Sequence, residues 1–204
     1  NQALRQGVLD YDRRHGYRGP EGYIDIAGTP PNLEEMLEDA LTETDESNEL
    51  FPAVALVAGA NEIKAYVKGG EHISIAGDGL KFAAKAFNDK ADPKMRLRRG
   101  SLIRVKKDDK GAWHIAQLPQ VESALLSMDP ADGAIRALVG GFDFNRSKFN
   151  HVTQAWRQPG SSFKPYIYSA ALEKGFMTST VINDAPVLID PARTGGQLWD
   201  PKNY

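Results

Sequence analysis

Cysteine is absent from this chain of 204 residues. Its absence excludes disulfide bonds, thiolate metal ligands and a cysteine nucleophile, and it is compatible with both oxidising and reducing compartments. An excess of either charge is also lacking, because 25 Lys and Arg residues oppose 27 Asp and Glu residues and give a formal net charge of −2. Such a chain is not a general polyanion binder, although a local basic patch is compatible with this balance.

Long apolar runs are lacking as well. The longest is Ala53–Ala60, far shorter than the roughly 20 residues that a membrane-spanning helix needs. The chain opens with neither a secretory signal pattern nor an initiator Met, so we expect a fragment of a longer protein. Hydrophobic residues at 41% and charged residues at 25% predict a globular chain of one or two domains.

The first part of the chain, residues 1–31, is predicted to be a linker. Gly and Pro punctuate this stretch, and no helical or strand period extends beyond Val8. The alternative is a small anion or partner site formed by Arg13, Arg14 and His15.

A helix is predicted to follow Pro30-Pro31. Asn32 is its candidate N-cap, with Glu35 three residues later as in a capping box. The eight acidic residues between Glu34 and Glu49 are strung along the chain, so we interpret them as a solvated face rather than a metal site. Apolar residues follow the helical period at Leu33, Met36, Leu37, Ala40 and Leu41.

Five short strands are predicted next, each bounded by Gly, Asn or Asp. Gly111 occupies the turn of the last strand pair. Five strands with one small helix are the inventory of a small closed β-barrel of the oligonucleotide/oligosaccharide-binding (OB) type. The strands cover residues 52–57, 62–68, 72–75, 101–107 and 113–118, and the helix covers residues 83–87.

A basic cluster lies on this barrel. OB barrels often bind oligonucleotides or oligosaccharides, but here the platform for base stacking would consist of little beyond Trp113 and Tyr66. We therefore interpret the cluster as a solvated strand face, with nucleic-acid binding as the alternative. Its members are Lys94, Arg96, Arg98, Arg99, Arg104, Lys106 and Lys107.

A β-hairpin is predicted beyond Val121. Residues 122–129 and 133–141 read as its strands, and Pro130-Ala131-Asp132 as its turn. Residues 142–156 are polar and irregular. Together with the barrel, the hairpin predicts an α+β fold.

A candidate nucleophile, Ser161, stands at the start of a further predicted helix. Pro159-Gly160 ends an extended stretch, and Pro165 must lie in the first helical turn because it lacks a backbone N–H. The helix therefore begins close to Ser161. Its apolar stripe consists of Phe163, Tyr166, Ile167, Ala170 and Ala171.

Ser161 and Lys164 are spaced to share one face of that helix, so the lysine amine can reach the serine hydroxyl. The positive end of the helix dipole favours a neutral lysine and a developing oxyanion. A buried, deprotonated Lys164 could then act as general base for Ser161. A bare Ser-x-x-Lys arises by chance about once in a chain of this length, so a helix cap followed by an exposed lysine is the alternative.

Two longer stretches make the pattern specific. Residues 140–146 (GGFDFNR) and 157–165 (RQPGSSFKP) closely resemble the start of the transpeptidase domain in class A penicillin-binding proteins of the Gram-negative 1A type. Residues 125–141 resemble the hairpin ahead of the active serine in that family. Residues 10–20 (DYDRRHGYRGP) resemble the link that leaves its glycosyltransferase domain.

The resemblance implies a bifunctional glycosyltransferase and transpeptidase of peptidoglycan synthesis, anchored in the inner membrane and facing the periplasm. Its transpeptidase would cross-link stem peptides through an acyl-enzyme and release a terminal D-Ala, and β-lactams would acylate the same serine. By position, Ser161 is the nucleophile and Lys164 its general base. The resemblance implies no cofactor and no metal. The implied partners are the stem peptides, the lipid-linked precursor and β-lactam antibiotics, with a periplasmic or outer-membrane lipoprotein activator as a further candidate.

Two motifs of the family are missing from this chain, since neither Ser-x-Asn nor Lys-Thr-Gly occurs. Arg193-Thr194-Gly195-Gly196 is interpreted as a turn. We expect a linker from an upstream glycosyltransferase domain over residues 1–31, a helix and OB-like barrel over 32–119, and an incomplete transpeptidase domain over 120–204. The fragment alone is expected to be inactive. The rival interpretations are a regulatory module that docks a partner protein, and an oligonucleotide-binding barrel with an incidental Ser-x-x-Lys.

Overall fold

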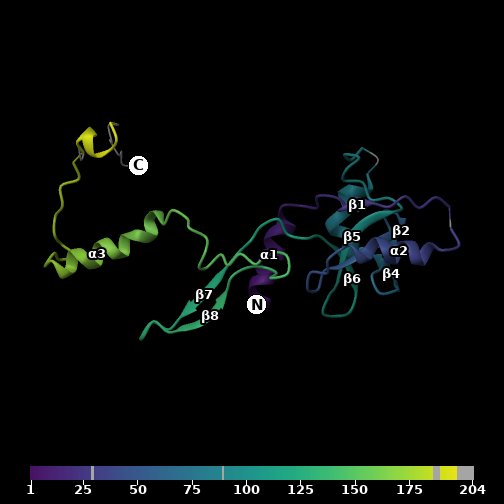
Figure 1. Ribbon diagram of the computed structural model, residues 1–204, viewed down its shortest axis with the longest axis horizontal. Helices are drawn as coiled ribbons and strands as arrows, with labels where there is room; N and C mark the ends of the chain where they lie inside the picture. Colours follow the sequence, from purple (N-terminus) through teal and green to yellow (C-terminus); the bar gives the residue numbers. More distant parts are fainter. Residues whose placement is uncertain (29, 89, 186–188, 197–204) are drawn as a thin grey trace. The chain divides into compact units, whose positions relative to one another are not determined.

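The computed structural model describes residues 1–28, 30–88, 90–185 and 189–196 (Figure 1). The chain divides into two compact units, Asn1–Trp156 and Arg157–Tyr204. Residues 197–204, at the end of the expected transpeptidase segment, lie outside the described residues. Helices and strands are mixed, as the predicted α+β class requires.

An antiparallel sheet is the centre of the first unit. Strand β2 (Phe51–Ala58) pairs with β3 (Glu62–Val67) on one side and with β5 (Ser101–Lys107) on the other. Strand β3 also pairs with β4 (Glu71–Ala76). The second edge of β5 is shared, because β1 (Gly22–Tyr23) pairs with its first residues and β6 (Trp113–Ala116) with its last. All five predicted strands are therefore confirmed, and β1 is an addition.

The predicted closure of the barrel is wrong. Among the described residues no strand ladder joins β4 to β6, and the 3₁₀ helix η1 (Gly77–Phe87) packs against both strands instead. Gly79 permits this close approach. A Cβ atom at that position would overlap the carbonyl oxygen of Trp113 in β6 and lie 2.7 Å from Cγ2 of Ile75 in β4. The packing of η1 against β4 and β6, which Gly79 allows, thus takes the place of a strand pair between β4 and β6.

The predicted acidic helix is confirmed as α2 (Leu33–Thr42). Leu37 and Leu41 are fully buried and pack against Val54 and Tyr66 of the sheet. Asn32 is the N-cap residue of α2, as predicted, but its side chain makes no capping hydrogen bond. Its backbone (φ −106°, ψ 31°) is not in the extended conformation that an N-cap side chain needs to reach back to the first turn.

A helix, α1 (Gln2–Arg14), lies within residues 1–31, the stretch predicted to be a linker. It buries Leu4, Val8 and Asp12, which lie four residues apart on one face. The apolar period stops at Val8 because the third buried position is an aspartate. Asp12 keeps the helical spacing but is not apolar, so a prediction based on hydrophobic periodicity does not detect the helix.

The side chains proposed as an anion site at the end of α1 make local contacts. Arg13 lies over the Phe82 ring, 5.6 Å from its centroid, and the His15 Nδ1 atom is 2.8 Å from the Tyr11 carbonyl oxygen. Arg13 and Arg14 also occupy the last helical turn, where cations interact favourably with the helix dipole. These contacts explain the presence of Arg13, Arg14 and His15 without a bound anion.

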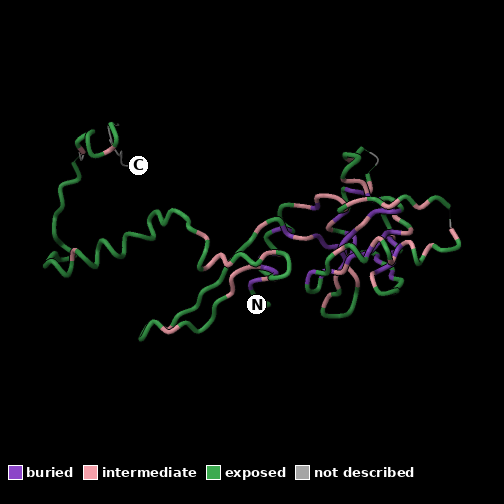
Figure 2. The backbone as a smooth tube through the Cα atoms, viewed as in Figure 1, coloured by how far each residue is buried: buried purple, intermediate pink, exposed green. Residues whose placement is uncertain are grey.

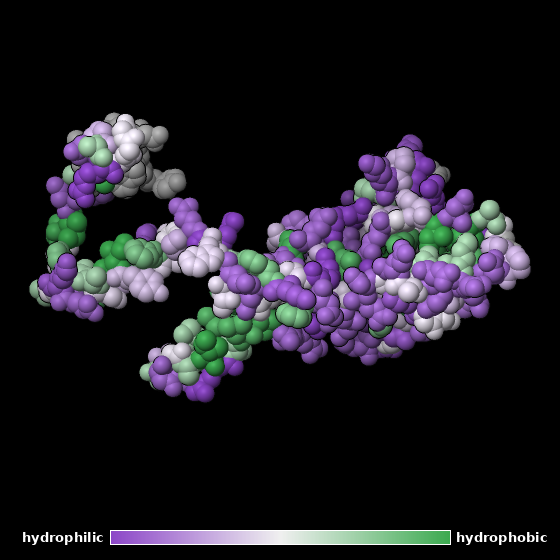
Figure 3. Space-filling view, in the orientation of Figure 1, coloured by the Kyte–Doolittle hydropathy of each residue, from purple (hydrophilic) through white to green (hydrophobic). Residues whose placement is uncertain are grey.

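The predicted hairpin is confirmed as β7 (Leu125–Met128) and β8 (Ile135–Val139). Asp129 closes its turn by accepting hydrogen bonds from Arg136 and from the Ala131 N–H, and these bonds lower its pKa. Apolar side chains gather over the hairpin in Figure 3. The most exposed are Leu126, Met128 and Ile135.

The second unit contains the 3₁₀ helix η2 (Gly160–Phe163), helix α3 (Lys164–Glu173) and the 3₁₀ turn η3 (Pro191–Arg193). The Gly196 N–H donates to the Pro191 carbonyl oxygen at 2.8 Å. The interpretation of residues 193–196 as a turn is therefore confirmed.

Replacement of Gly79 by alanine tests the packing of η1. We expect Gly79→Ala to lower the free energy of unfolding by about 1–3 kcal/mol, the usual cost of overpacking. Gly7→Ala is the matched control, because a Cβ at Gly7 in the middle of α1 meets nothing within 4 Å. Removing a helical glycine there should instead stabilise the chain by about 0.5–1 kcal/mol. Urea unfolding followed by circular dichroism measures both, and a neutral Gly79→Ala would contradict the packing described here.

Candidate active site

The candidate nucleophile follows a glycine with left-handed backbone geometry. Gly160 has φ +56°, which an L-residue with a side chain rarely adopts. This conformation reverses the chain after Pro159 and starts η2, in which the Ser162 N–H donates to the Pro159 carbonyl oxygen at 3.2 Å. Pro165 lies in the first turn of α3, as predicted. The sequence Pro-Gly-Ser-Ser therefore places Ser161 at the head of a helix.

Ser161 and Lys164 are one 3₁₀ turn apart. The Lys164 N–H donates to the Ser161 carbonyl oxygen, and residues three apart eclipse each other in a 3₁₀ turn. The predicted shared face is thus present in the backbone. Both side chains are exposed, and within the described residues no hydrogen bond joins Ser161 Oγ to Lys164 Nζ.

The apolar stripe of α3 lies open in its own unit, as the exposed trace of this segment in Figure 2 shows. Tyr166 is 70% exposed and Ile167 56%. One flank of α3 borders an open apolar groove whose other wall includes Met177 and Ile182. The burial on which a general-base role for Lys164 depends is not supplied by the described residues of this unit.

None of the four histidines belongs to the second unit, and each has a partner in the first. His114 Nε2 is 3.0 Å from Asp108, and His72 Nε2 is 3.4 Å from Glu34. The hydrogen bond from the Ala112 N–H contributes most to lowering the pKa of Asp108, and the contact with His114 lowers it further. The described part of the second unit therefore holds no histidine that could form a Ser-His-Asp arrangement with Ser161.

In the described part of the chain no three His, Asp or Glu side chains lie close enough together to hold a metal ion. None of the helices described is both long enough and apolar enough to cross a bilayer.

Arg104 differs from the solvated strand face predicted for the basic cluster. Its side chain is 3% exposed, and Nε and Nη2 donate to the Glu21 carboxylate at 2.8 and 3.0 Å. Nη1 donates to the Asp45 carbonyl oxygen at 2.6 Å. The prediction for Arg104 is wrong, because a planar guanidinium can satisfy several buried acceptors at once. It ties β5 to the chain ahead of β1 and β2.

The proposed stacking platform is not formed either. Tyr66 is 5% exposed beneath α2, and its Oη donates to Glu38 at 3.1 Å. Burial and the Glu38 carboxylate raise the pKa of Tyr66. Trp113 is covered on one side by Lys107, whose Nζ is 4.5 Å from the ring centroid. These contacts oppose base stacking on Tyr66 and Trp113.

Two buried carboxylates were not predicted from the sequence. Asp12 is 4% exposed and Asp143 is 5% exposed, and each joins segments about a hundred residues apart. The only sequence signal for Asp12 is its four-residue spacing from Leu4 and Val8. Asp143 lies inside GGFDFNR, one of the stretches that carries the resemblance.

Two family models match the chain. The model of the penicillin-binding protein OB-like domain matches residues 17–121, and that of the penicillin-binding protein transpeptidase domain matches residues 124–203. Ser161 and Lys164 lie within the second match.

Named relatives match nearly the whole chain. Penicillin-binding protein 1A of Neisseria meningitidis is 42% identical over 203 residues, which is 99% of this chain and 25% of that protein. The Pseudomonas aeruginosa protein of the same name is 38% identical over 209 residues, with 100% and 25% covered. The crystal structure of penicillin-binding protein 1A from Haemophilus influenzae has a TM-score of 0.72 at 33% identity and covers 99% of this chain and 29% of that one. The chain thus spans about a quarter of the length of these curated relatives.

Proposed function

This chain belongs to the penicillin-binding proteins, and from that premise we propose that it carries the nucleophile and general base of a serine-type D,D-transpeptidase. One observation carries the proposal. Within the match to the transpeptidase domain, a left-handed Gly160 places Ser161 at the head of α3, with Lys164 one turn later. The OB-like domain is proposed to cover residues 32–119 and the start of the transpeptidase domain residues 120–204.

The proposed reaction is acyl transfer. The neutral Lys164 amine takes the proton of the Ser161 hydroxyl while Oγ attacks the carbonyl carbon between two D-Ala residues of a stem peptide. The positive end of the helix dipole stabilises the developing oxyanion. When the C–N bond breaks, the departing D-Ala amine takes up the proton and Ser161 holds the acyl group. An amine of a second stem peptide then attacks the acyl carbonyl carbon, its proton passes through Lys164 to the departing Ser161 Oγ, and the new amide bond is the cross-link.

The setting of this reaction is inferred from the family. The chain is proposed to be part of a bifunctional glycosyltransferase and transpeptidase at the periplasmic face of the inner membrane. Peptidoglycan stem peptides are the proposed substrates, and β-lactams are the proposed inhibitors that acylate Ser161. The lipid-linked precursor and a lipoprotein activator belong to the same proposal.

Mass spectrometry of the parent protein after exposure to penicillin tests the nucleophile. We expect one penicilloyl adduct on Ser161, because the adjacent Lys164 can activate only that hydroxyl from one turn away. Ser161→Ala should abolish the adduct, whereas Ser162→Ala should retain it. An adduct mapped to Ser162, or one that survives in Ser161→Ala, would contradict the assignment.

The general base is tested by acylation rates. Lys164→Ala in the parent protein should slow acylation by about 10²–10⁴-fold, the usual contribution of a general base. Lys164→Arg should be equally slow, because a guanidinium does not give up its proton. Lys174→Ala, at the far end of α3, is the matched control with an expected rate equal to the parent's. A fast Lys164→Arg would show that only the positive charge is needed.

The 204 residues alone are expected not to bind penicillin covalently. Ser161, Lys164 and the apolar stripe of α3 are exposed among the described residues, and a short helix without tertiary packing is marginal in water. Hydrogen exchange should therefore show protected strands β2 to β5 and little protection at Ala170 and Ala171. Stoichiometric labelling by a fluorescent penicillin would overturn this expectation.

A further inference from the structure

Asp143 is a buried carboxylate that joins two distant parts of the first unit. Its Oδ2 atom accepts hydrogen bonds from Ser47 Oγ at 2.5 Å and from Asn48 Nδ2 at 3.1 Å. Its Oδ1 atom accepts from the Asn145 N–H at 3.0 Å, which fixes the carboxylate locally. Ser47 and Asn48 precede β2 in the OB-like region, whereas Asp143 follows β8 in the transpeptidase match.

The neighbouring Phe142 packs the same segment against α1. It is 2% exposed and packs in a cluster with Leu4, Val8, Leu50 and Ala116. Its carbonyl oxygen accepts from Arg5 Nε at 3.1 Å, and its N–H donates to the Glu122 carboxylate at 3.1 Å. Helix α1 thus contacts both the backbone and the ring of Phe142, whereas the Asp143 carboxylate is held by the loop before β2.

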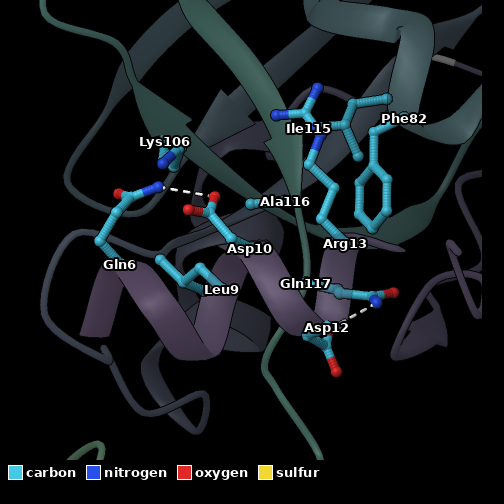
Figure 4. A pocket seen from close by; sticks show the side chains of 10 residues that line it. All are labelled: Gln6, Leu9, Asp10, Asp12, Arg13, Phe82, Lys106, Ile115, Ala116 and Gln117. Carbon is cyan, nitrogen blue, oxygen red and sulfur yellow. Dashed lines mark hydrogen bonds between the residues drawn. The ribbon is translucent and has the colours of Figure 1, made fainter. Parts of the chain in front are cut away.

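Asp12 provides a second attachment, at the other end of α1. Its Oδ1 atom accepts from Arg18 Nη1 at 2.8 Å. Its Oδ2 atom accepts from Gln117 Nε2 at 2.6 Å, the bond drawn between Asp12 and Gln117 in Figure 4. The Gln120 N–H also points at Oδ1, at 3.3 Å. In the OB-like region as the family model matches it, residues 17–121, Arg18 lies near the start, and Gln117 and Gln120 lie near the end.

Contacts at several separate points prevent the rotation that a single point of contact would allow. A segment held only at Asp12 could swivel about that point, but the contacts of Phe142 and Asp143 hold it at a second place along α1 and on the loop before β2. Buried carboxylates keep such contacts closed, because opening them leaves a charge without donors in a low-dielectric site. The arrangement is that of a fixed junction.

We propose that Ser47, Asn48 and Asp143 form a latch that, together with α1, holds the OB-like region and the segment after β8 as one rigid body. The OB-like region is then fixed in position relative to the segment after β8, rather than joined to it by a flexible linker. The proposal goes beyond the proposed transpeptidase function and does not require it, since the rigidity resides in the first unit alone.

A pair of spin labels on the full chain measures this rigidity, and the absence of native cysteine makes the labelling specific. Lys64→Cys on β3 and Lys148→Cys beyond the latch are both exposed positions. We expect a narrow distance distribution by double electron–electron resonance. The variant Ser47→Ala/Asn48→Gly removes both donors, and glycine suits the φ of +53° at residue 48. It should broaden the distribution clearly.

Hydrogen exchange on the same chains separates the latch from a simple contribution to folding. The Ser147 N–H, which donates to the Asp143 carbonyl oxygen at 3.0 Å, should exchange at least about tenfold faster in the double variant. Amides of Ile63 and Ile103 within the sheet should exchange as in the parent. Asp132→Ala is the matched control, because among the described residues that carboxylate accepts only from the nearby Ala134 N–H, and it should change neither readout.

Three outcomes would refute the latch. An unbroadened distance distribution in a folded double variant would do so, as would a broad distribution in the parent. Loss of sheet protection together with the Ser147 amide would show that Ser47 and Asn48 belong to the core rather than to a junction. If the double variant does not fold, Asn48→Gly alone is measured in the same way, and unchanged exchange at Ser147 refutes the proposal.

Discussion

The burial of the Asp12 carboxylate is the constraint on which the first unit depends. A buried carboxylate must be given donors, and withdrawing one costs about 1–3 kcal/mol. Its donors are Arg18, Gln117 and the backbone of Gln120, so the two ends of the OB-like region are required to meet at the end of α1. Once they meet there, the chain after the sheet is directed back along α1, where Phe142 packs, and the Asp143 carboxylate reaches the loop before β2.

Much of the sheet follows from local sequence. Alternating apolar residues and turn residues such as Gly111 were enough to place β2 to β6, and the helical spacing of Leu37 and Leu41 was enough to place α2. The closure of the barrel could not be predicted in this way. It depends on which element reaches the gap between β4 and β6, and that choice rests on the missing Cβ of Gly79.

Buried polar residues are the other place where local patterns are insufficient. Arg104 alternates correctly for a strand, but whether its guanidinium faces water or the Glu21 carboxylate is decided by a segment eighty residues away. The candidate site is likewise predictable from the sequence only in part. The order Gly160, Ser161, Lys164 predicts the helix start and the spacing. The burial that would make the Lys164 amine a base is a tertiary property that four consecutive residues do not specify.

The meeting of residues 16–18 with residues 117–120 has a topological consequence. A region whose ends lie side by side behaves as an insertion: the chain on either side is connected almost as it would be by a short turn. The length and content of such a region can change during evolution without displacing the elements that flank it, because no new distance has to be spanned. Selection would then act on the surface of the OB-like region independently of the elements that flank it, while residues 47 and 48 remain tied to the segment after β8 through Asp143.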